Sequence, residues 1–170
     1  SLGVRSLNAI DLLKFNDLKK KNILMLIVSS ISIIAAILNQ VVTQNMGRLV
    51  FYSIELLGFV FIFVLFHVLL KRHILFPYIG VIFVYLYNIF SVFVFEANLT
   101  PVIIGLFLTL IAAIHFNSRI FTIGYILGLV LLITTYVLDT NKIDIIQSTY
   151  MTVFIVYILT GIVLGVLIYL

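Results

Sequence analysis

Six long apolar runs separated by short polar segments dominate this sequence, and they require that most of the chain lies in a membrane. Hydrophobic residues make up 64% of the 170 positions, charged residues make up 9%, and the mean hydropathy is +1.34. A soluble domain carries roughly a quarter charged residues. A chain this apolar cannot cover its surface with polar groups in water. The composition therefore excludes a soluble enzyme, a nucleic-acid-binding domain and a disordered linker.

Each run is long enough to cross the hydrocarbon as a helix, which takes about 20 mostly apolar residues. The short connections between the runs favour antiparallel neighbours. We therefore predict an all-α integral membrane bundle of six transmembrane helices over residues 23–170, preceded by a lead-in at residues 1–22. The predicted spans are residues 23–42, 49–70, 74–95, 100–116, 120–138 and 148–170.

Lys and Arg in the short connections predict the orientation, because cytoplasmic loops carry an excess of both residues. If the N-terminus is inside, the outer connections hold only Arg48 and Lys142. The inner side then holds the other basic residues, which are Arg5, Lys14, Lys19, Lys20, Lys21, Lys71, Arg72 and Arg119. This asymmetry predicts that the N-terminus and the C-terminus are both cytoplasmic.

The segment 6–22 mixes apolar, acidic and basic residues ahead of the first span. An amphipathic helix lying on the inner leaflet would place its lysines near anionic lipid. The apolar residues do not form one clean stripe, so a structural lead-in to the first span fits equally well. The sequence begins with Ser1 and ends inside an apolar run at Leu170, so we expect the chain to be part of a longer protein.

Glu55 is the leading candidate for a functional site, since an ionisable residue within the hydrocarbon is costly and usually marks function. Other polar side chains fall at a similar depth in the outer half of the spans, which predicts a polar cavity that opens outward. Alternatively, these groups hydrogen-bond one another between helices or form an interfacial aromatic belt. The other candidate ligand-binding residues are Asn39, Gln40, Tyr52, Asn88, Ser91, Tyr136 and Tyr150.

Two of the three histidines, His67 and His115, fall at compatible depths near the inner face. Imidazoles on facing helices can bind haem or a metal ion. Interfacial histidines beside basic residues are the simpler interpretation, so we expect no cofactor and no metal. Cysteine is absent and no catalytic motif occurs at a matched membrane depth, so the sequence does not predict an enzyme.

Two small-residue motifs lie in the last two predicted spans. Gly124 and Gly128 are four residues apart in the fifth, and Gly161 and Gly165 are four residues apart in the sixth. This spacing lets helix backbones approach closely. Packing within one chain and formation of a homodimer explain the motifs equally well.

The first span is entered through the stretch Asp17-Leu18-Lys19-Lys20-Lys21-Asn22-Ile23-Leu24-Met25-Leu26, and the sixth span is an uninterrupted apolar run. In these features the chain resembles the six-span membrane input module of some bacillus-type methyl-accepting chemotaxis proteins and related sensor kinases. The resemblance implies a bacterial cell membrane and a homodimeric receptor. It also implies a last helix that leads into a cytoplasmic signalling region with its own partners.

The resemblance favours a sensory input domain that detects an extracellular or membrane-borne small molecule or cation. The alternative is a small-solute transporter, similar to the substrate-binding subunits of vitamin uptake transporters. Those subunits are usually richer in Gly and Ala, whereas this chain has 9 glycines and 2 prolines. A third interpretation is an accessory subunit of a larger membrane complex. In each case the lipid bilayer is the main partner, and no nucleic acid is expected.

Overall fold

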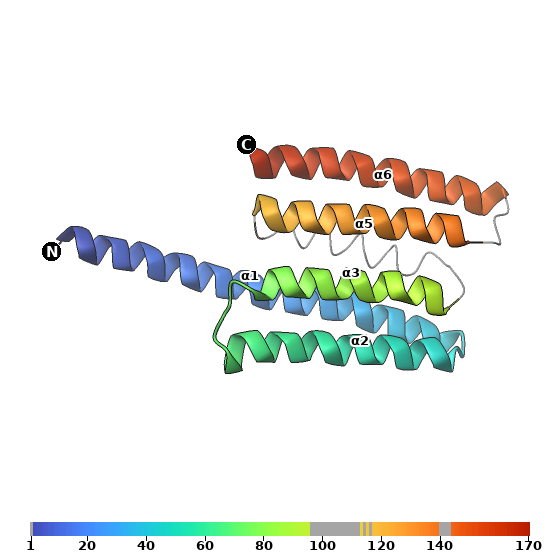
Figure 1. The fold of residues 1–170 in the computed structure, drawn as a ribbon, viewed down its shortest axis with the longest axis horizontal. Coiled ribbons are helices and arrows are strands. Elements are labelled where there is room, and N and C mark those ends of the chain that lie inside the picture. The colour runs from blue at the N-terminus through green and yellow to red at the C-terminus, as the bar shows by residue number, and fades with distance from the viewer. Residues whose placement is uncertain (1, 96–112, 114, 116, 140–143) are drawn as a thin grey trace.

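The computed structural model describes residues 2–95, 113, 115, 117–139 and 144–170. The regular structure of these residues is helical throughout, without a strand. The helices, labelled as in Figure 1, are α1 (Leu2–Val42), α2 (Met46–Val64), the π-helix η1 (Leu65–Leu69), α3 (Phe76–Val94), α5 (Ser118–Leu138) and α6 (Asp144–Tyr169).

Five helical segments are long and apolar enough to cross a membrane, so the chain is a multi-pass membrane protein. Within the described residues, helices of this kind lie at five of the six predicted spans. The remaining one, at residues 100–116, lies outside the described residues except at positions 113 and 115. The five segments are Ala9–Val42, Met46–Leu69, Phe76–Val94, Ser118–Leu138 and Thr149–Tyr169.

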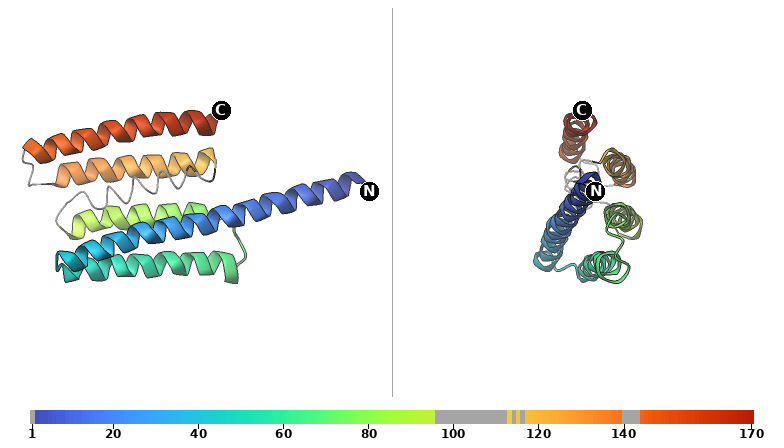
Figure 2. Two further views of the ribbon diagram at one scale, coloured as in Figure 1. Left: turned by 180° about the vertical axis from the view of Figure 1, so that it is seen from behind. Right: turned by 90° about the vertical axis from the view of Figure 1, so that its left-hand side faces the viewer.

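The helices lie side by side in the order α2, α3, α5 and α6, and α1 packs across α2 and α3 (Figures 1 and 2). The lead-in and the first span form one continuous helix, α1, of about 60 Å. Its N-terminal part projects beyond the ends of the other helices (Figure 1). The lead-in is therefore a helical extension of the first span.

Among the described residues, buried apolar side chains form two clusters. The larger cluster, which includes Met25 and Phe59, joins α1, α2, α3 and α5. The smaller cluster joins α5 to α6 through Leu132, Tyr150 and Tyr157. Many other large apolar side chains are exposed along the helices, as contact with lipid requires.

Side-chain caps and a proline mark where three of the helices begin. The Asn45 side chain accepts a hydrogen bond from Arg48 N over 3.2 Å at the start of α2. In the same way, the Asn117 side chain accepts from Arg119 N over 2.9 Å at the start of α5. Pro77 lies in the first turn of α3, where its missing N–H costs nothing.

The connection from α2 to α3 begins with a π-helical turn. Leu70 N donates to Leu65 O over 2.8 Å, and Arg72 N donates to Phe66 O over 2.8 Å. Lys71 then takes the left-handed backbone conformation, with φ of 51°, and the chain reverses into α3. Short π-helical segments are rare and frequently occur at functional sites.

The predicted glycine motifs contribute to packing between α5 and α6 within the chain. A Cβ on Gly128 would collide with the hydroxyl group of Tyr157, and a Cβ on Gly161 would collide with the ring of Tyr125. The two tyrosine rings stack with centroids 4.7 Å apart, and Tyr157 Oη donates to Tyr125 O over 2.6 Å. Each helix thus supplies a glycine that makes room for a tyrosine of the other.

Candidate functional site

Glu55 of α2 and Asn88 of α3 form a buried polar pair. Both side chains are 0% exposed, and Asn88 Nδ2 donates to Glu55 Oε1 over 2.9 Å. The same amide nitrogen donates to Val84 O over 2.8 Å, which fixes the orientation of the amide. Glu55 follows Met46, the start of α2, by about 14 Å along the helix. The pair therefore lies in the half of the bundle nearer the α1–α2 turn.

One oxygen of each of these side chains lacks a hydrogen bond from the described part of the chain. These atoms are Glu55 Oε2 and Asn88 Oδ1, and both are buried. An unpaired buried acceptor costs about 1–3 kcal/mol. A proton, a cation or a donor group of a ligand would satisfy them.

Other predicted site residues lie at the same end of the bundle. Tyr52 is buried one turn before Glu55, and Gln40 is buried on α1. Ser91 is also buried, and its Oγ donates to Asn88 O over 2.6 Å. Asn39, in contrast, is exposed, because it is next to Gln40 on a helix and so points in a different direction.

The two remaining candidates, Tyr136 and Tyr150, belong to α5 and α6 and are not part of this group. Tyr150 is buried and donates to Asp139 Oδ2 over 2.6 Å, and its ring meets Tyr136 edge to face at 5.5 Å. Both tyrosines line a largely apolar groove of about 340 Å³ between the two helices. The structure thus divides the predicted cavity into two separate regions.

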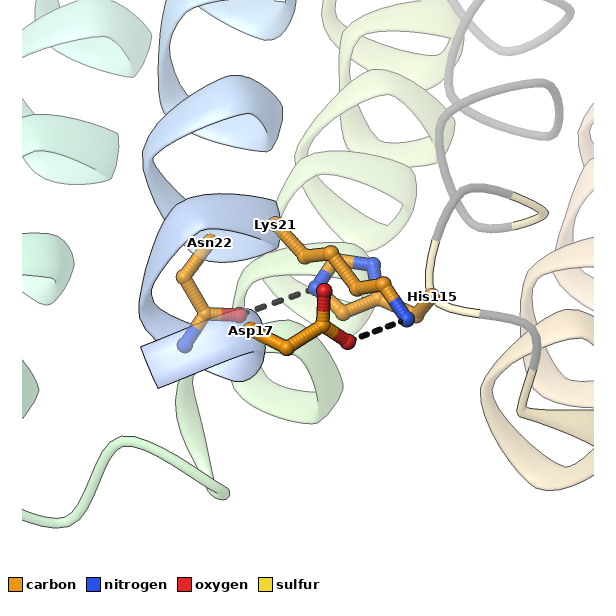
Figure 3. Close-up of polar contacts among 4 residues, drawn as sticks. All are labelled: Asp17, Lys21, Asn22 and His115. Atoms are coloured by element: carbon orange, nitrogen blue, oxygen red, sulfur yellow. Dashed lines mark hydrogen bonds and ion pairs between the residues drawn. The ribbon is translucent and has the colours of Figure 1, made fainter. Parts of the chain in front are cut away.

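A second polar cluster, which the sequence did not predict, is centred on Asn22 at the opposite end of the bundle. Asn22 is 0% exposed on α1, and its side chain contacts all three histidines. Its Oδ1 lies 2.9 Å from His115 Nε2 (Figure 3), and its Nδ2 lies 2.9 Å from His67 Nε2. The amide nitrogen also donates to His73 O over 2.8 Å. One amide therefore joins α1, η1, the turn before α3 and the residues before α5.

The His73 carbonyl determines how protons are arranged in this cluster. Because a carbonyl only accepts, the atom facing it must be the Asn22 amide nitrogen, which then also donates to His67 Nε2. His67 must carry its proton on Nδ1, and it donates that proton to His73 Nδ1 over 3.1 Å. His115 Nε2 donates to Asn22 Oδ1. The network is complete only when His67 and His73 are both neutral.

Lys21 directly precedes Asn22 on α1. Its Nζ pairs over 2.8 Å with Oδ2 of Asp17, which lies one turn before Lys21 (Figure 3). His73 lies edge to face with Phe15, with ring centroids 4.9 Å apart, and Lys19 Nζ lies over the Phe15 ring. Burial lowers the pKa of His73 below its ordinary value, and the nearby Lys19 ammonium lowers it further.

We expect this pKa shift to make the protein less stable in mild acid. Unfolded histidine titrates near about 6.5. Below that pH the unfolded chain binds a proton that folded His73 resists, so the free energy of unfolding falls as the pH falls toward the lower folded pKa. Thermal unfolding in detergent between about pH 8 and pH 5 measures this effect. In His73→Gln the pH dependence should be weaker, and an unchanged pH dependence would assign it to other groups.

The histidines predicted as weak haem or metal candidates, His67 and His115, both bind Asn22, which stands between them. Within the described residues, no group of three or more His, Asp or Glu side chains lies close enough to hold a metal ion. The hydrogen bonds instead indicate a structural cluster. The sequence missed it because hydropathy gave no signal for Asn22, which sits at the boundary of the first predicted span.

Comparisons of this chain with family models, with curated proteins and with solved structures gave no match.

Proposed function

We propose that the protein is a sensory input domain embedded in a bacterial cell membrane. It detects an extracellular or membrane-borne small molecule or cation at the Glu55–Asn88 pair. It passes the change through α6 to a cytoplasmic signalling region. The observation that carries this proposal is the completely buried pair, in which Glu55 Oε2 and Asn88 Oδ1 lack hydrogen-bond partners among the described residues.

The packing of the helices supports a route from this pair to α6. Asn88 belongs to α3, which packs against α5, and α5 packs against α6. The rings of Tyr125 and Tyr157 fit against glycines of the opposite helix, which gives a movement of α5 a direct contact through which to displace α6. A ligand that shifts α3 would therefore change the position of α6. The excess of Lys and Arg in the predicted inner connections supports cytoplasmic termini.

Replacing Glu55 by Gln tests this proposal, because the amide keeps the shape of the side chain and removes its charge. We expect the affinity for the detected solute to fall about 10-fold to 100-fold, as expected for loss of a hydrogen bond to a charged group. The measurement is solute-induced thermal stabilisation of the purified chain, using alkali cations and a panel of small polar solutes.

Asp139→Asn is the matched control for this experiment. It removes a carboxylate at the same end of the bundle, but that carboxylate binds Tyr150 and lies outside the pair. Equal affinity in the Glu55→Gln and wild-type proteins would remove Glu55 from the mechanism. Flux of the bound solute into proteoliposomes would favour transport, whereas binding without flux favours sensing. Instability of the isolated chain with no solute binding would favour an accessory subunit.

A further inference from the structure

A groove of about 380 Å³ lies between the projecting part of α1 and the turn that leads into α3. Phe15 and Leu18 line it on the α1 side, and residues 71–75 line the other side. The turn lies between the spans Met46–Leu69 and Phe76–Val94, which places the groove at a boundary of the membrane.

Three cationic side chains lie in or beside this groove, and two of them, Lys71 and Arg72, line it. Lys71 and Arg72 are exposed in the turn. Lys19 Nζ lies 4.4 Å from the centre of the Phe15 ring, and that ring contacts His73 on the opposite wall. Cationic side chains are thus present on both sides of the groove.

None of these three cations is paired with a carboxylate of the described residues. Asp17 on α1 is already bound to Lys21. Asp11 lies one turn before Phe15 and makes no ion pair within the part of the chain that the structure describes. The charge at the groove is therefore complementary to an anion.

The remaining surface of the groove is apolar and continues into exposed apolar residues. Ile74 lines the groove and is 65% exposed, and Leu69 and Leu70, just before the turn, are also exposed. A free anion would gain nothing from this surface, whereas an acyl chain would bury it. Basic pockets beside membrane helices are typical binding sites for anionic lipid headgroups.

We propose that this groove binds the phosphate headgroup of an anionic phospholipid, with Lys19, Lys71 and Arg72 as its cationic ligands. The acyl chains extend over Ile74 and the neighbouring leucines. A bound lipid joins α1 to the α2–α3 turn beside the Asn22 network, because His73 belongs to both the groove and that network. This site is independent of the Glu55–Asn88 pair.

The test is a lipid titration of the full chain in detergent, followed by native mass spectrometry. The probes are phosphatidylglycerol, phosphatidylcholine of the same acyl chains, and inorganic phosphate. We expect phosphatidylglycerol to bind at least tenfold more tightly than phosphatidylcholine. The double variant Lys71→Gln/Arg72→Gln should lose at least tenfold in phosphatidylglycerol affinity, and Lys19→Gln alone should lose a smaller factor.

The double variant Lys20→Gln/Arg119→Gln is the matched control, since it removes the same charge from exposed positions that do not line the groove. It should bind phosphatidylglycerol within twofold of wild type. Equal losses in both double variants would overturn the proposal, because the attraction would then reflect net charge alone. Competition by inorganic phosphate as strong as that by phosphatidylglycerol would also overturn it, because a free anion would then be the ligand. If the groove double variant is misfolded, as judged by gel filtration, the comparison of Lys19→Gln with Lys20→Gln decides the proposal.

Discussion

Replacing Asn22 by Leu should lower the free energy of unfolding by about 2–4 kcal/mol. The substitution removes the Asn22 hydrogen bonds to His115, His67 and the His73 carbonyl, and it leaves those partners buried or partly buried without this amide. A single interhelical hydrogen bond in a membrane protein averages about 0.6 kcal/mol. The larger effect is expected here because three partners lose the same side chain at once.

The measurement is the midpoint of thermal unfolding in detergent micelles, followed by gel filtration of the heated protein. Asn39→Leu is the matched control on the same helix, because Asn39 is exposed and its side chain makes none of the hydrogen bonds described above. This control should change stability by less than about 0.5 kcal/mol. Equal midpoints for the two variants would show that the Asn22 network does not hold the helices together.

The apolar runs alone were sufficient to predict most of the fold. A continuous stretch of about 20 apolar residues in lipid forms a helix, because the helix satisfies every backbone hydrogen bond within the segment. The same reasoning identified Glu55 and Asn88 as polar residues at a similar depth, and the structure joins them with a hydrogen bond. The position of a residue within its apolar run therefore predicts its depth in the membrane.

The position of a residue does not predict which side of the bundle it faces or which helices it contacts. Tyr136 and Tyr150 share the predicted depth of Glu55 but belong to the α5–α6 pair on another side of the bundle. Uniformly apolar helices give no stripe that would show which face is buried, so nothing in the sequence separated Gln40 from Asn39. The Asn22 cluster depends on residues 45 to 93 positions apart in the sequence, and no local pattern brings them together.

The π-helical turn is a second reason why the sequence did not predict the Asn22 cluster. His67 lies in η1 and His73 follows it by six residues, yet their Nδ1 atoms are 3.1 Å apart. Regular helical spacing would not bring residues six apart to the same face. The wider turn and the left-handed backbone at Lys71 bring them together instead.

Replacing Gly161 by Ala should destabilise the contact between α5 and α6, whereas the same change at Gly165 should not. The new methyl group at position 161 would overlap the Tyr125 ring, which is held by stacking on Tyr157. Overpacking of this kind costs about 1–3 kcal/mol. At position 165 the nearest atom, Phe121 Cε1, would be 3.9 Å from the new Cβ, an ordinary contact. Since Ala is a better helix former than Gly by about 1 kcal/mol, Gly165→Ala should be neutral or stabilising.

Comparing the effects of Gly161→Ala and Gly165→Ala shows whether these glycines pack helices within one chain or between two chains. The sequence contains no cysteine, so spin labels can be attached at exposed Ile133 and Ile155 after substitution by Cys. We expect Gly161→Ala to broaden the distance distribution between the labels and to lower the unfolding midpoint, with no change in oligomeric state. If Gly161 and Gly165 instead formed a homodimer contact, both substitutions would weaken self-association and leave the label distance unchanged. Because the collision is with Tyr125 of the same chain, the structure predicts the first result.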